Sequence, residues 1–566
     1  MKRSDRTAAR GRLVPGSVLS LALAAAASAC AGEVTGGEPG EGDALTPGLQ
    51  PPVAAAGSVE VTLHPGAEAT VGQPAVISFA APFPRGALAD ASLLRAVDQG
   101  GEELPVHAEE ILPWRSMPGG PEAGASVRAA MVSVEVTLAE RAPRTITLEY
   151  GAAPSATLEP PADPRADWVP VKDGEYPSGA VREPRVYASF PADWLSSCLL
   201  RGRTTEVGAD SSWSWYDESL IGSAHTAVND VPAQVTQTID HLGDFDPWLF
   251  DRSATLFGVY VRTGDVKWLR HAHRSAQYYL SKVTPEGYFG LKDGDLKYAY
   301  GRSLLLDFVL TGDPALVDAI ERVAAAASTW NPTYDLGVNF WTERHQTYAL
   351  LAALAAWQAT GKQEHADRVK QIVDASFALA AQPPAGWKAD GCMLHGMTAH
   401  EGAGGDVPVC SPWMSALFGD AVWEYYTQSG DEAALEFLDG LGQYVVDHGL
   451  YGGGDGLDFT MPWYLASSAK TFSDAGPWGD VEHTCDVAGL VARAAYARDQ
   501  LGSDPAELRA AATELVRGCQ YDLNMWHRPD GMAEGLAEWR LAPARKFNWW
   551  FGTTLDMPWL LEQVAE

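Results

Sequence analysis

Side chains that often take part in catalysis gather at the starts of the helices predicted for the C-terminal two-thirds of this chain. Helix starts commonly carry Asp, Asn and Glu as caps, but capping does not require His, Tyr, Arg and Trp as well. Their concentration at one predicted rim of the helical region is typical of a carbohydrate cleft. The residues are Asp244, Asp246, Trp248, Tyr298, Tyr300, Arg302, Asn339, Trp341, Glu343, Arg344, His345, His395, His400, Glu401, Trp413, Trp463, Tyr464, Glu482, His483, Asp486, Asn548, Trp549 and Trp550.

The first chemistry that these residues could perform is β-elimination at a uronate sugar. This reaction needs a group that neutralises the sugar carboxylate, a base that removes the neighbouring proton, and an acid that protonates the leaving oxygen. Asn339 and Arg344 are the predicted carboxylate-binding residues. The candidate bases and acids are His345, His400, His483 and one of Tyr298 and Tyr300.

Two other functions remain open on the same residues. A glycoside hydrolase needs two carboxylates that lie about 5–10 Å apart across the scissile bond. A surface protein that only binds glycans would use the same aromatic and polar side chains without catalysis. The excess of His, Tyr and Arg favours elimination over hydrolysis. The candidate carboxylates for hydrolysis are Asp244, Asp246, Glu343, Glu401, Glu482 and Asp486.

Further residues of this rim are predicted to contact the sugar directly. Each also has a structural interpretation, because Trp side chains build cores and buried Arg, Glu and His side chains form ion-pair networks. Arg344 and His345 are open to that interpretation too, and His400 lies in a loop of small residues. The additional predicted substrate-binding residues are Arg302, Trp341, Glu343, Trp413, Trp463, Glu482 and Asn548.

A metal site is the alternative to a metal-free cleft. Cys392, His395, His400 and Cys410 have the side-chain types of a zinc site. In an exported protein, however, a Cys392–Cys410 disulfide is the more common outcome. The glycine-rich stretch 452–458 lacks the spacing of a known calcium loop. We therefore predict no cofactor, with a divalent metal as the alternative. Neither a phosphate-binding glycine loop nor a nucleophile-elbow serine motif stands out.

A short turn recurs between the predicted helices that position these residues. A Gly can end one helix in the left-handed conformation, and an Asp can cap the next. The C-terminal two-thirds is therefore predicted to be a series of helical hairpins. The copies are Thr263-Gly264-Asp265, Thr311-Gly312-Asp313, Thr360-Gly361-Lys362, Ser429-Gly430-Asp431 and a weaker Leu501-Gly502-Ser503-Asp504.

Five hairpins and a closing helix follow from apolar residues that recur every three or four positions. This number fits an incomplete (α/α) toroid of five or six pairs, with an open superhelix as the alternative. Two long connections, 383–410 and 450–480, both lead into the first helix of a hairpin and should share the rim with the polar residues. The predicted helices are 245–261, 266–283, 296–310, 314–330, 342–359, 364–381, 413–428, 432–448, 481–500, 505–526 and 547–565.

Residues 58–151 are predicted to form β-strands, because apolar and polar residues alternate from Val59 to Leu63 and turn residues separate further such runs. The predicted fold is therefore an N-terminal antiparallel barrel or sandwich followed by the helical toroid. Residues 152–240 are rich in Pro, Asp, Trp and Ser, and are predicted to be a connector with one short strand at 185–190. Residues 241–566 form the predicted catalytic toroid.

The strand region also carries a family resemblance. Its residues are Gly72-Gln73-Pro74, Pro82-Phe83-Pro84-Arg85-Gly86, Leu94-Arg95, Asp98-Gln99-Gly100-Gly101 and Leu112-Pro113-Trp114. This run resembles the N-terminal RIFT-barrel domain of exo-rhamnogalacturonan lyase-like proteins. The resemblance implies a RIFT-like barrel in a glycan-active protein, and it favours the lyase. Those proteins tend to carry a further β-sandwich before the helices, and the turn-rich residues 152–240 do not show a complete one.

The first 30 residues have the features of an export signal. They contain five basic residues, and the apolar run 18–27 is too short to span a membrane. Ala27-Ser28-Ala29-Cys30 resembles a bacterial lipobox, which implies cleavage before Cys30 and lipidation of that residue. An ordinary signal peptide is the alternative. Residues 31–57, rich in Gly, Pro, Glu and Ala, are predicted to be a disordered tether from an outer-membrane or cell-surface lipid anchor.

The chain has a formal net charge of −32. Removal of residues 1–30 would take away five basic residues and one acidic residue, which makes the charge more negative still. Nucleic acid is therefore not an expected partner. The predicted partner is an acidic polysaccharide or oligosaccharide, which requires a locally basic cleft. The expected contact with a membrane is through the lipid anchor alone.

Five cysteines remain after the predicted cleavage site, and export makes disulfides the expected state. A Cys392–Cys410 bond would close one loop, and a Cys485–Cys519 bond would join the two helices of one hairpin. Cys198 is left over. The sequence alone does not fix this pairing.

Overall fold

The structure is a computed structural model that describes residues 56–118, 126–171, 176, 179–228, 242–292, 294–454, 456–527 and 539–565. The predicted signal peptide, the lipidation site at Cys30 and nearly all of the predicted tether lie outside these residues, so those expectations stay predictions. Within the described ranges, no helix has both the length and the apolar character that crossing a bilayer requires.

The N-terminal region contains two antiparallel sheets. Val59, Val61 and Leu63 of β1 (Gly57–Pro65) are buried, and they alternate with more exposed residues, as predicted. One sheet has the strand order β10-β1-β7-β3-β4 and the other β2-β6-β5. The antiparallel β class is thus confirmed, and the RIFT-like barrel stays a prediction. The other strands are β2 (Pro74–Pro82), β3 (Leu94–Asp98), β4 (Glu103–Leu104), β5 (Val106–Pro113), β6 (Val127–Thr137), β7 (Arg144–Tyr150) and β10 (Val186–Ser189).

The segment predicted to be a connector contributes to both parts of the molecule. Its strand β10 lies within the predicted stretch 185–190 and pairs with β1. It also contains β8 (Val169–Pro170), β9 (Arg182–Glu183), α1 (Ala192–Ser197) and α2 (Ser214–Ala227). The sequence analysis did not predict α2, which packs against α4, α15 and α16 of the helical part.

The recurring turn ends one helix and caps the next, as predicted. In the first copy Gly264 has φ 63°, and its N–H donates to the carbonyl of Tyr260 at 2.8 Å. The Asp265 side chain accepts the N–H of Lys267 at 2.9 Å. The Thr263 hydroxyl accepts the N–H of Asp265 at 3.2 Å, which gives the first residue of the motif a role in holding the turn. The left-handed glycine is repeated at Gly312, Gly361, Gly430 and Gly502.

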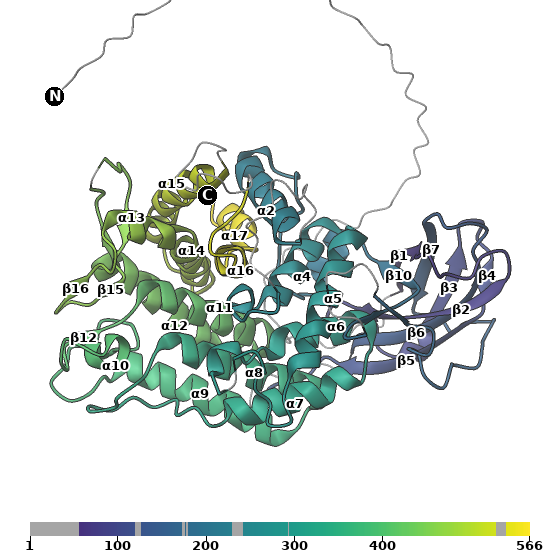
Figure 1. The fold of residues 1–566 in the computed structure, drawn as a ribbon, viewed down its shortest axis with the longest axis horizontal. Helices are drawn as coiled ribbons and strands as arrows, with labels where there is room; N and C mark the ends of the chain where they lie inside the picture. Colours follow the sequence, from purple (N-terminus) through teal and green to yellow (C-terminus); the bar gives the residue numbers. More distant parts are fainter. Residues whose placement is uncertain are drawn as a thin grey trace, which may run out of the picture. The chain divides into compact units, whose positions relative to one another are not determined.

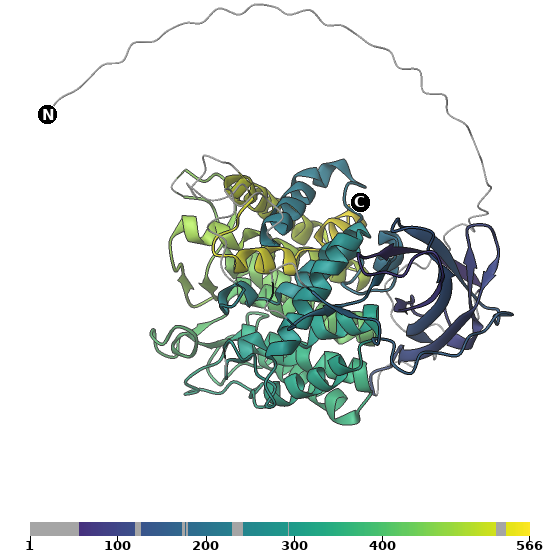
Figure 2. The same cartoon turned by 45° about the vertical axis from the view of Figure 1, so that its right-hand side comes forward.

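The C-terminal helices form a closed ring, as the predicted toroid of five or six pairs requires and its alternative, an open superhelix, does not. Among the described residues, α4, α6, α8, α11, α14 and α16 contact one another in that order, and α16 returns to α4. Nearly every residue of α8 and α11 is buried, as expected for helices with neighbours on all sides. Figures 1 and 2 show this helical part. The helices are α4 (Arg252–Thr263), α5 (Val266–Lys282), α6 (Gly301–Thr311), α7 (Ala315–Ala327), α8 (Glu343–Thr360), α9 (Gln363–Ala381), α11 (Pro412–Ser429), α12 (Glu432–Tyr444), α14 (Thr484–Gln500), α15 (Ala506–His527), α16 (Arg545–Gly552) and α17 (Met557–Gln563).

The two ends of this ring have different neighbours. Near the recurring turns, the strand region donates hydrogen bonds to helix ends: Arg115 Nε to the Gln358 carbonyl at 3.0 Å, and Arg85 to the Gln428 carbonyl at 3.2 Å. The long insertions lie on the other side of the helices from the strand region in Figure 1. Their short elements are β11 (His395–Gly396), α10 (Met397–Glu401), β12 (Pro408–Val409), β13 (Leu450–Tyr451), β14 (Met461–Pro462), β15 (Leu465–Ala466), β16 (Thr471–Phe472) and α13 (Pro477–Asp480).

Both predicted disulfides are present. Cys392 pairs with Cys410 across 18 positions of the first insertion, and Cys485 joins α14 to Cys519 of α15. The backbone N–H and carbonyl of Cys410 also exchange hydrogen bonds of 2.9 Å with Ala466 of the second insertion. The two insertions are thus fastened to each other. The fifth cysteine, Cys198, is buried and unbonded.

Candidate functional site

An aromatic and cationic cluster lies where the two insertions meet the starts of α8, α11 and α14. The indole of Trp413 stacks on the His483 ring at a centroid distance of 5.0 Å and 20° between planes. The guanidinium of Arg344 lies 5.6 Å from the centre of the same indole. Tyr464 and Trp549 lie 6.0 and 5.3 Å from it. We call Arg344, Trp413, Tyr464, His483 and Trp549 the Trp413 cluster.

Arg344 is the cation of this cluster. It occupies the first turn of α8, after Thr342 has capped the helix by accepting the N–H of His345. Among the described residues no carboxylate pairs with it, and its Nε meets no hydrogen-bond acceptor. Burial lowers the pKa of Arg344, and the nearby hydroxyls of Tyr348 and Tyr464 oppose that effect. An arginine stays charged in such a place, so this site offers a guanidinium to an anion.

His345 is positioned beside the cluster as a neutral imidazole. Its ring stacks on Trp330 at 5.1 Å, meets Phe340 edge-on at 4.8 Å, and contacts the Thr342 hydroxyl through Nδ1 at 2.8 Å. Burial, with the positive charge of Arg344 beside it, lowers the pKa of His345 to about 3. A histidine with that pKa is neutral at neutral pH, so it is not available there as an imidazolium acid.

Glu343 and two histidines form a second group next to the cluster. Glu343 Oε2 lies 3.2 Å from His395 Nε2, and Ser411 donates its N–H to Glu343 Oε1 at 2.7 Å. His400 Nδ1 lies 3.4 Å from His395 Nε2. The side chains of Glu343 and His395 are completely buried. The structure thus brings together Glu343, His395 and His400, which the sequence had divided between substrate binding, catalysis and a cysteine-based zinc site.

The candidate carboxylates for hydrolysis have partners of their own. Asp486 is buried and accepts the indole N–H of Trp549 at 2.9 Å. Glu482 pairs with Lys546 at 2.7 Å, and Asp246 pairs with Arg545. Asp244 is exposed, and the side chain of Glu401 lies outside the described residues. Among the described residues, these carboxylates do not present an unpaired couple to one cleft.

Several predicted residues lie away from the Trp413 cluster. Arg302 forms buried ion pairs with Asp420 and Glu424, and Asn548 donates to the carbonyls of Pro247 and Leu249. Tyr300 accepts the N–H of Phe250, and the buried Tyr298 packs on Phe289. Trp463 stacks on Tyr451, Trp341 is buried against His395, and Asn339 is exposed on the loop before α8. Their predicted roles in binding or catalysis stay predictions, and these contacts are structural.

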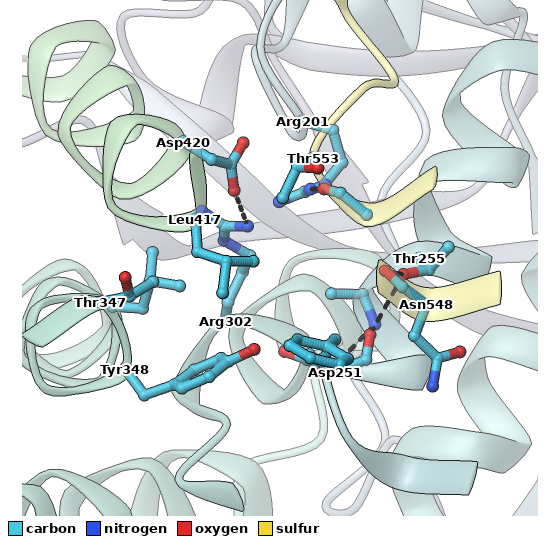
Figure 3. Close-up of a pocket in the computed structure, with 14 residues that line it drawn as sticks. Arg201, Asp251, Thr255, Arg302, Thr347, Tyr348, Leu417, Asp420, Asn548 and Thr553 are labelled. Atoms are coloured by element: carbon cyan, nitrogen blue, oxygen red, sulfur yellow. Dashed lines mark hydrogen bonds and ion pairs between the residues drawn. The ribbon is translucent and has the colours of Figure 1, made fainter. Parts of the chain in front are cut away.

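The centre of the ring contains a small pocket next to the Trp413 cluster: Phe250 lines the pocket and packs on Trp413 and Trp549. Tyr348, Asp251, Arg302 and Asp420 line it, together with Arg201 (Figure 3). The dashed contact in Figure 3 between Arg302 and Asp420 is an ion pair of 2.6 Å. Arg201 instead donates to the Gly552 carbonyl, and Asp251 accepts the N–H of Ala254, so the pocket combines an ion pair with hydrogen bonds to the backbone, which is typical of a structural core.

Neither Tyr348 nor Tyr464 had a predicted role, although Tyr464 is one of the rim residues. Tyr348 follows Arg344 by four positions on α8, so one turn of helix places both on the same face. That spacing was a usable signal, but Tyr348 also fitted the apolar pattern of an inner helix. Tyr464 follows Trp463 directly, and the extended backbone sends neighbouring side chains in opposite directions. Nothing in the sequence distinguished which of the two faces the cluster.

The sequence matches no protein-family model and no curated protein. Among solved structures, an unsaturated glucuronyl hydrolase from Streptococcus agalactiae is similar with a TM-score of 0.39 and 11% identity, over 62% of this chain and 97% of that one. Cellobiose 2-epimerase from Bacillus thermoamylovorans gives a TM-score of 0.39 and 11% identity, over 59% and 98%. An α-1,6-mannanase of Salegentibacter sp. gives 0.38 and 11%, over 61% and 99%. At these TM-scores we assign nothing to this chain from the similarity.

Proposed function

We propose that this protein is a polysaccharide lyase that cleaves a uronate-containing glycan by β-elimination at the Trp413 cluster. The observation that carries the proposal is Arg344, a half-buried guanidinium with which no described carboxylate forms a direct ion pair, although Asp295 acts on it from a longer distance. An uncompensated cation in a partly buried site is costly unless the function supplies its anion. A sugar carboxylate has the charge and the planar geometry that a guanidinium binds best.

The cluster also supplies the remaining parts of the reaction. With the carboxylate on Arg344, the His483 ring removes the proton on the carbon next to the carboxyl group. The electron pair of that C–H bond forms a carbon–carbon double bond, and the bond to the 4-linked oxygen breaks. Tyr464 gives its proton to that oxygen. His483 lies 5.9 Å from Tyr464 between ring centres, so one sugar unit could contact both side chains.

Other features of this end of the ring support a sugar ligand. Trp413 provides an indole face beside the cation, and aromatic faces pack on the apolar side of sugar rings. Phe340, on the loop that leads into α8, is 50% exposed, and Trp478 of α13 is 41% exposed. Exposed aromatic side chains of this size can mark a binding surface. A chain of several sugar units could therefore extend from the cluster across these residues.

A glycoside hydrolase on the same cleft is the alternative. It is the weaker proposal because Glu343, Asp486, Glu482 and Asp246 already have hydrogen-bond or ion-pair partners. A glycan-binding surface protein without catalysis is the third candidate. We further propose that the chain is exported and anchored through a lipid on Cys30. Mass spectrometry of the protein purified from membranes of its bacterial host would show an acylated N-terminal Cys30, and an unmodified N-terminus at another residue would contradict this.

The direct test is incubation of the full-length chain with a panel of polyuronates and glycosaminoglycans. Elimination produces a double bond conjugated to the carboxyl group, which absorbs in the ultraviolet. We expect this absorbance to rise with at least one member of the panel. Release of reducing sugar without the absorbance would overturn the lyase in favour of the hydrolase. Binding without any cleavage would favour the non-catalytic protein.

Variants connect the activity to the cluster. Arg344→Gln should lower kcat/KM by roughly 10²–10³, the usual loss on removal of one group that stabilises developing charge. His483→Gln should lower kcat by about 10²–10⁴ as expected for loss of a general base. The matched control is Arg517→Gln, because Arg517 is an exposed arginine on α15 whose ion pair is with Glu514 of the same helix. Equal activity of Arg344→Gln and this control would contradict the assignment of Arg344.

A further inference from the structure

Three ligand-type atoms converge on one point beside the Trp413 cluster. Glu343 Oε2 and His395 Nε2 are 3.2 Å apart, His395 Nε2 and His400 Nδ1 are 3.4 Å apart, and His400 Nδ1 and Glu343 Oε2 are 4.0 Å apart. A proton in a hydrogen bond can link only two of these three atoms at a time. A divalent cation between them would engage all three.

The size of this triangle matches a small transition-metal ion. From the three distances, the point equidistant from all three atoms lies about 2.1 Å from each. Bonds from zinc to imidazole nitrogen and carboxylate oxygen are about 2.0–2.2 Å long. Calcium prefers six or more oxygen ligands at about 2.3–2.6 Å, so both the distance and the two imidazoles disfavour it.

The protein holds these three side chains in place from several directions. Glu343 is the first residue of α8, and the N–H of Ser411 fixes its other carboxylate oxygen at 2.7 Å. His395 in β11 packs edge-on against the indole of Trp341 at 5.4 Å. The Cys392–Cys410 disulfide encloses the segment that carries both histidines. Such support from outside the ligand atoms is what a metal site requires of its surroundings.

We propose that Glu343, His395 and His400 form a zinc-binding site. Two imidazoles and one carboxylate leave a fourth tetrahedral position for water or a substrate oxygen, which is the ligand number of catalytic zinc sites. The cysteines expected as zinc ligands from the sequence are excluded, because Cys392 and Cys410 are bonded to each other. The metal would fasten the first insertion to the start of α8, one residue from Arg344. This proposal does not depend on the lyase activity.

The test is metal binding by the full-length chain, purified without a histidine tag and stripped with a chelator. Titration with zinc chloride followed by calorimetry should show one site per chain, and zinc should raise the melting temperature. Loading with cobalt(II) should give the visible absorption of a tetrahedral ion. His395→Gln and Glu343→Gln should each weaken zinc affinity by at least about 100-fold, more than loss of an outer-shell group usually costs.

His365→Gln is the matched control, because His365 lies on α9 beside Glu321 and is far from the triangle in the fold. It should retain wild-type affinity. Failure of the wild-type chain to bind zinc, or equal affinity in the wild type and His395→Gln, would overturn the proposal. If the variants do not fold, the wild-type stoichiometry and its cobalt spectrum still decide the question, since an octahedral spectrum or an absent site contradicts it.

Discussion

Arg344 differs from Arg262 and Arg493 in what lies opposite it. Arg262 pairs with Asp217 at 2.9 Å, and Arg493 pairs with Asp556 at 2.6 Å. Arg344 instead faces an indole and tyrosine hydroxyls. A missing carboxylate partner does not by itself mark a ligand site: the buried Arg128 packs on Trp114 and bonds to Gln358, whereas Arg344 is partly exposed. The local surroundings, and not the residue type, separate a structural arginine from a proposed ligand-binding one.

Glu183 gives a prediction at the scale of one residue. Burial raises its pKa, but the hydrogen bonds and charges of Arg270 and Arg274 outweigh burial and lower it to about 2. Since the unfolded carboxyl titrates near 4.3, the ion pairs stabilise the fold fully above that pH, and the stabilisation disappears as the pH falls towards 2. At neutral pH Glu183→Gln should lower the free energy of unfolding by about 3 kcal/mol. Denaturant unfolding should show a smaller difference in unfolding free energy between wild type and Glu183→Gln at pH 3 than at pH 7. An equal difference at both pH values would contradict a lowered pKa of Glu183.

At the scale of single residues, the sequence allowed individual site residues to be predicted better than contacts between residues that are distant in the sequence. Arg344 and His345 were predictable because they follow a capping Thr342 at the start of a long helix. The contact between Glu343 and His395 was not, because 52 positions separate them and only the folded insertion brings them together. Arg302 is the opposite case. It was predicted from the rim pattern to bind substrate, but it forms a buried ion pair with Asp420, which lies 118 positions away in the sequence.

The recurring turns join the helices at the end of the ring that faces the strand region. Gly264 is held against the backbone that links β10 to α1: a side chain there would meet the Phe190 carbonyl at 3.0 Å and the Ala192 nitrogen at 3.2 Å. Gly502 has the same left-handed conformation, at φ 75°, with nothing within 4 Å of the added carbon. The turn therefore serves as a helix connection everywhere and as a contact surface only in some copies.

The contrast between Gly264 and Gly502 predicts that replacement by alanine lowers the free energy of unfolding by different amounts at the two positions. Gly502→Ala should lower the free energy of unfolding by about 1 kcal/mol, the cost of a left-handed alanine. Gly264→Ala should cost about 1–3 kcal/mol more, because the new methyl group also crowds the backbone near Phe190. Urea unfolding of both variants measures the difference. Equal losses would show that the contact beside Gly264 relaxes freely.

Element prediction succeeded where the signal was local. A glycine and a cap within three residues specify a turn without help from the rest of the chain, so the hairpins were found. Helix α2 was missed because its stability comes from distant partners: Tyr216 bonds to Thr554, 338 positions away. Its sequence has no long apolar repeat that would reveal it. The closing helix at 547–565 was predicted from its local apolar pattern, and the contact of α16 with α4 confirms that the ring closes.

At the scale of the molecule, one ionic network joins the inner helices. Arg302 of α6 and Arg493 of α14 both pair with Asp420 of α11, at 2.6 and 3.0 Å. Arg493 also pairs with Asp556, next to α17. Burial raises the pKa of Asp420, but the surrounding arginines reverse this effect and lower it to about 2. The network therefore links ring members that are far apart in sequence.

Loss of one charge should destabilise the whole ring. Asp420→Asn leaves two buried guanidinium groups without their shared carboxylate, which should cost about 3–5 kcal/mol in the free energy of unfolding. The matched control is Asp439→Asn, because Asp439 pairs with Arg498 at 2.7 Å in a more exposed place and should contribute at most about 1 kcal/mol. Thermal and denaturant unfolding compare the two. Similar losses would show that the central network does not hold the ring together.

The measurement that tests the central proposal most directly is the mass of the products. In β-elimination the new double bond replaces a proton and the leaving oxygen, so the masses of the two products add up to that of the substrate. Hydrolysis adds one water to that sum. With a defined uronate oligosaccharide that the full-length chain cleaves, we predict products without added water, formed by the wild type and greatly reduced in Arg344→Gln. Products that together contain one additional water would contradict the account.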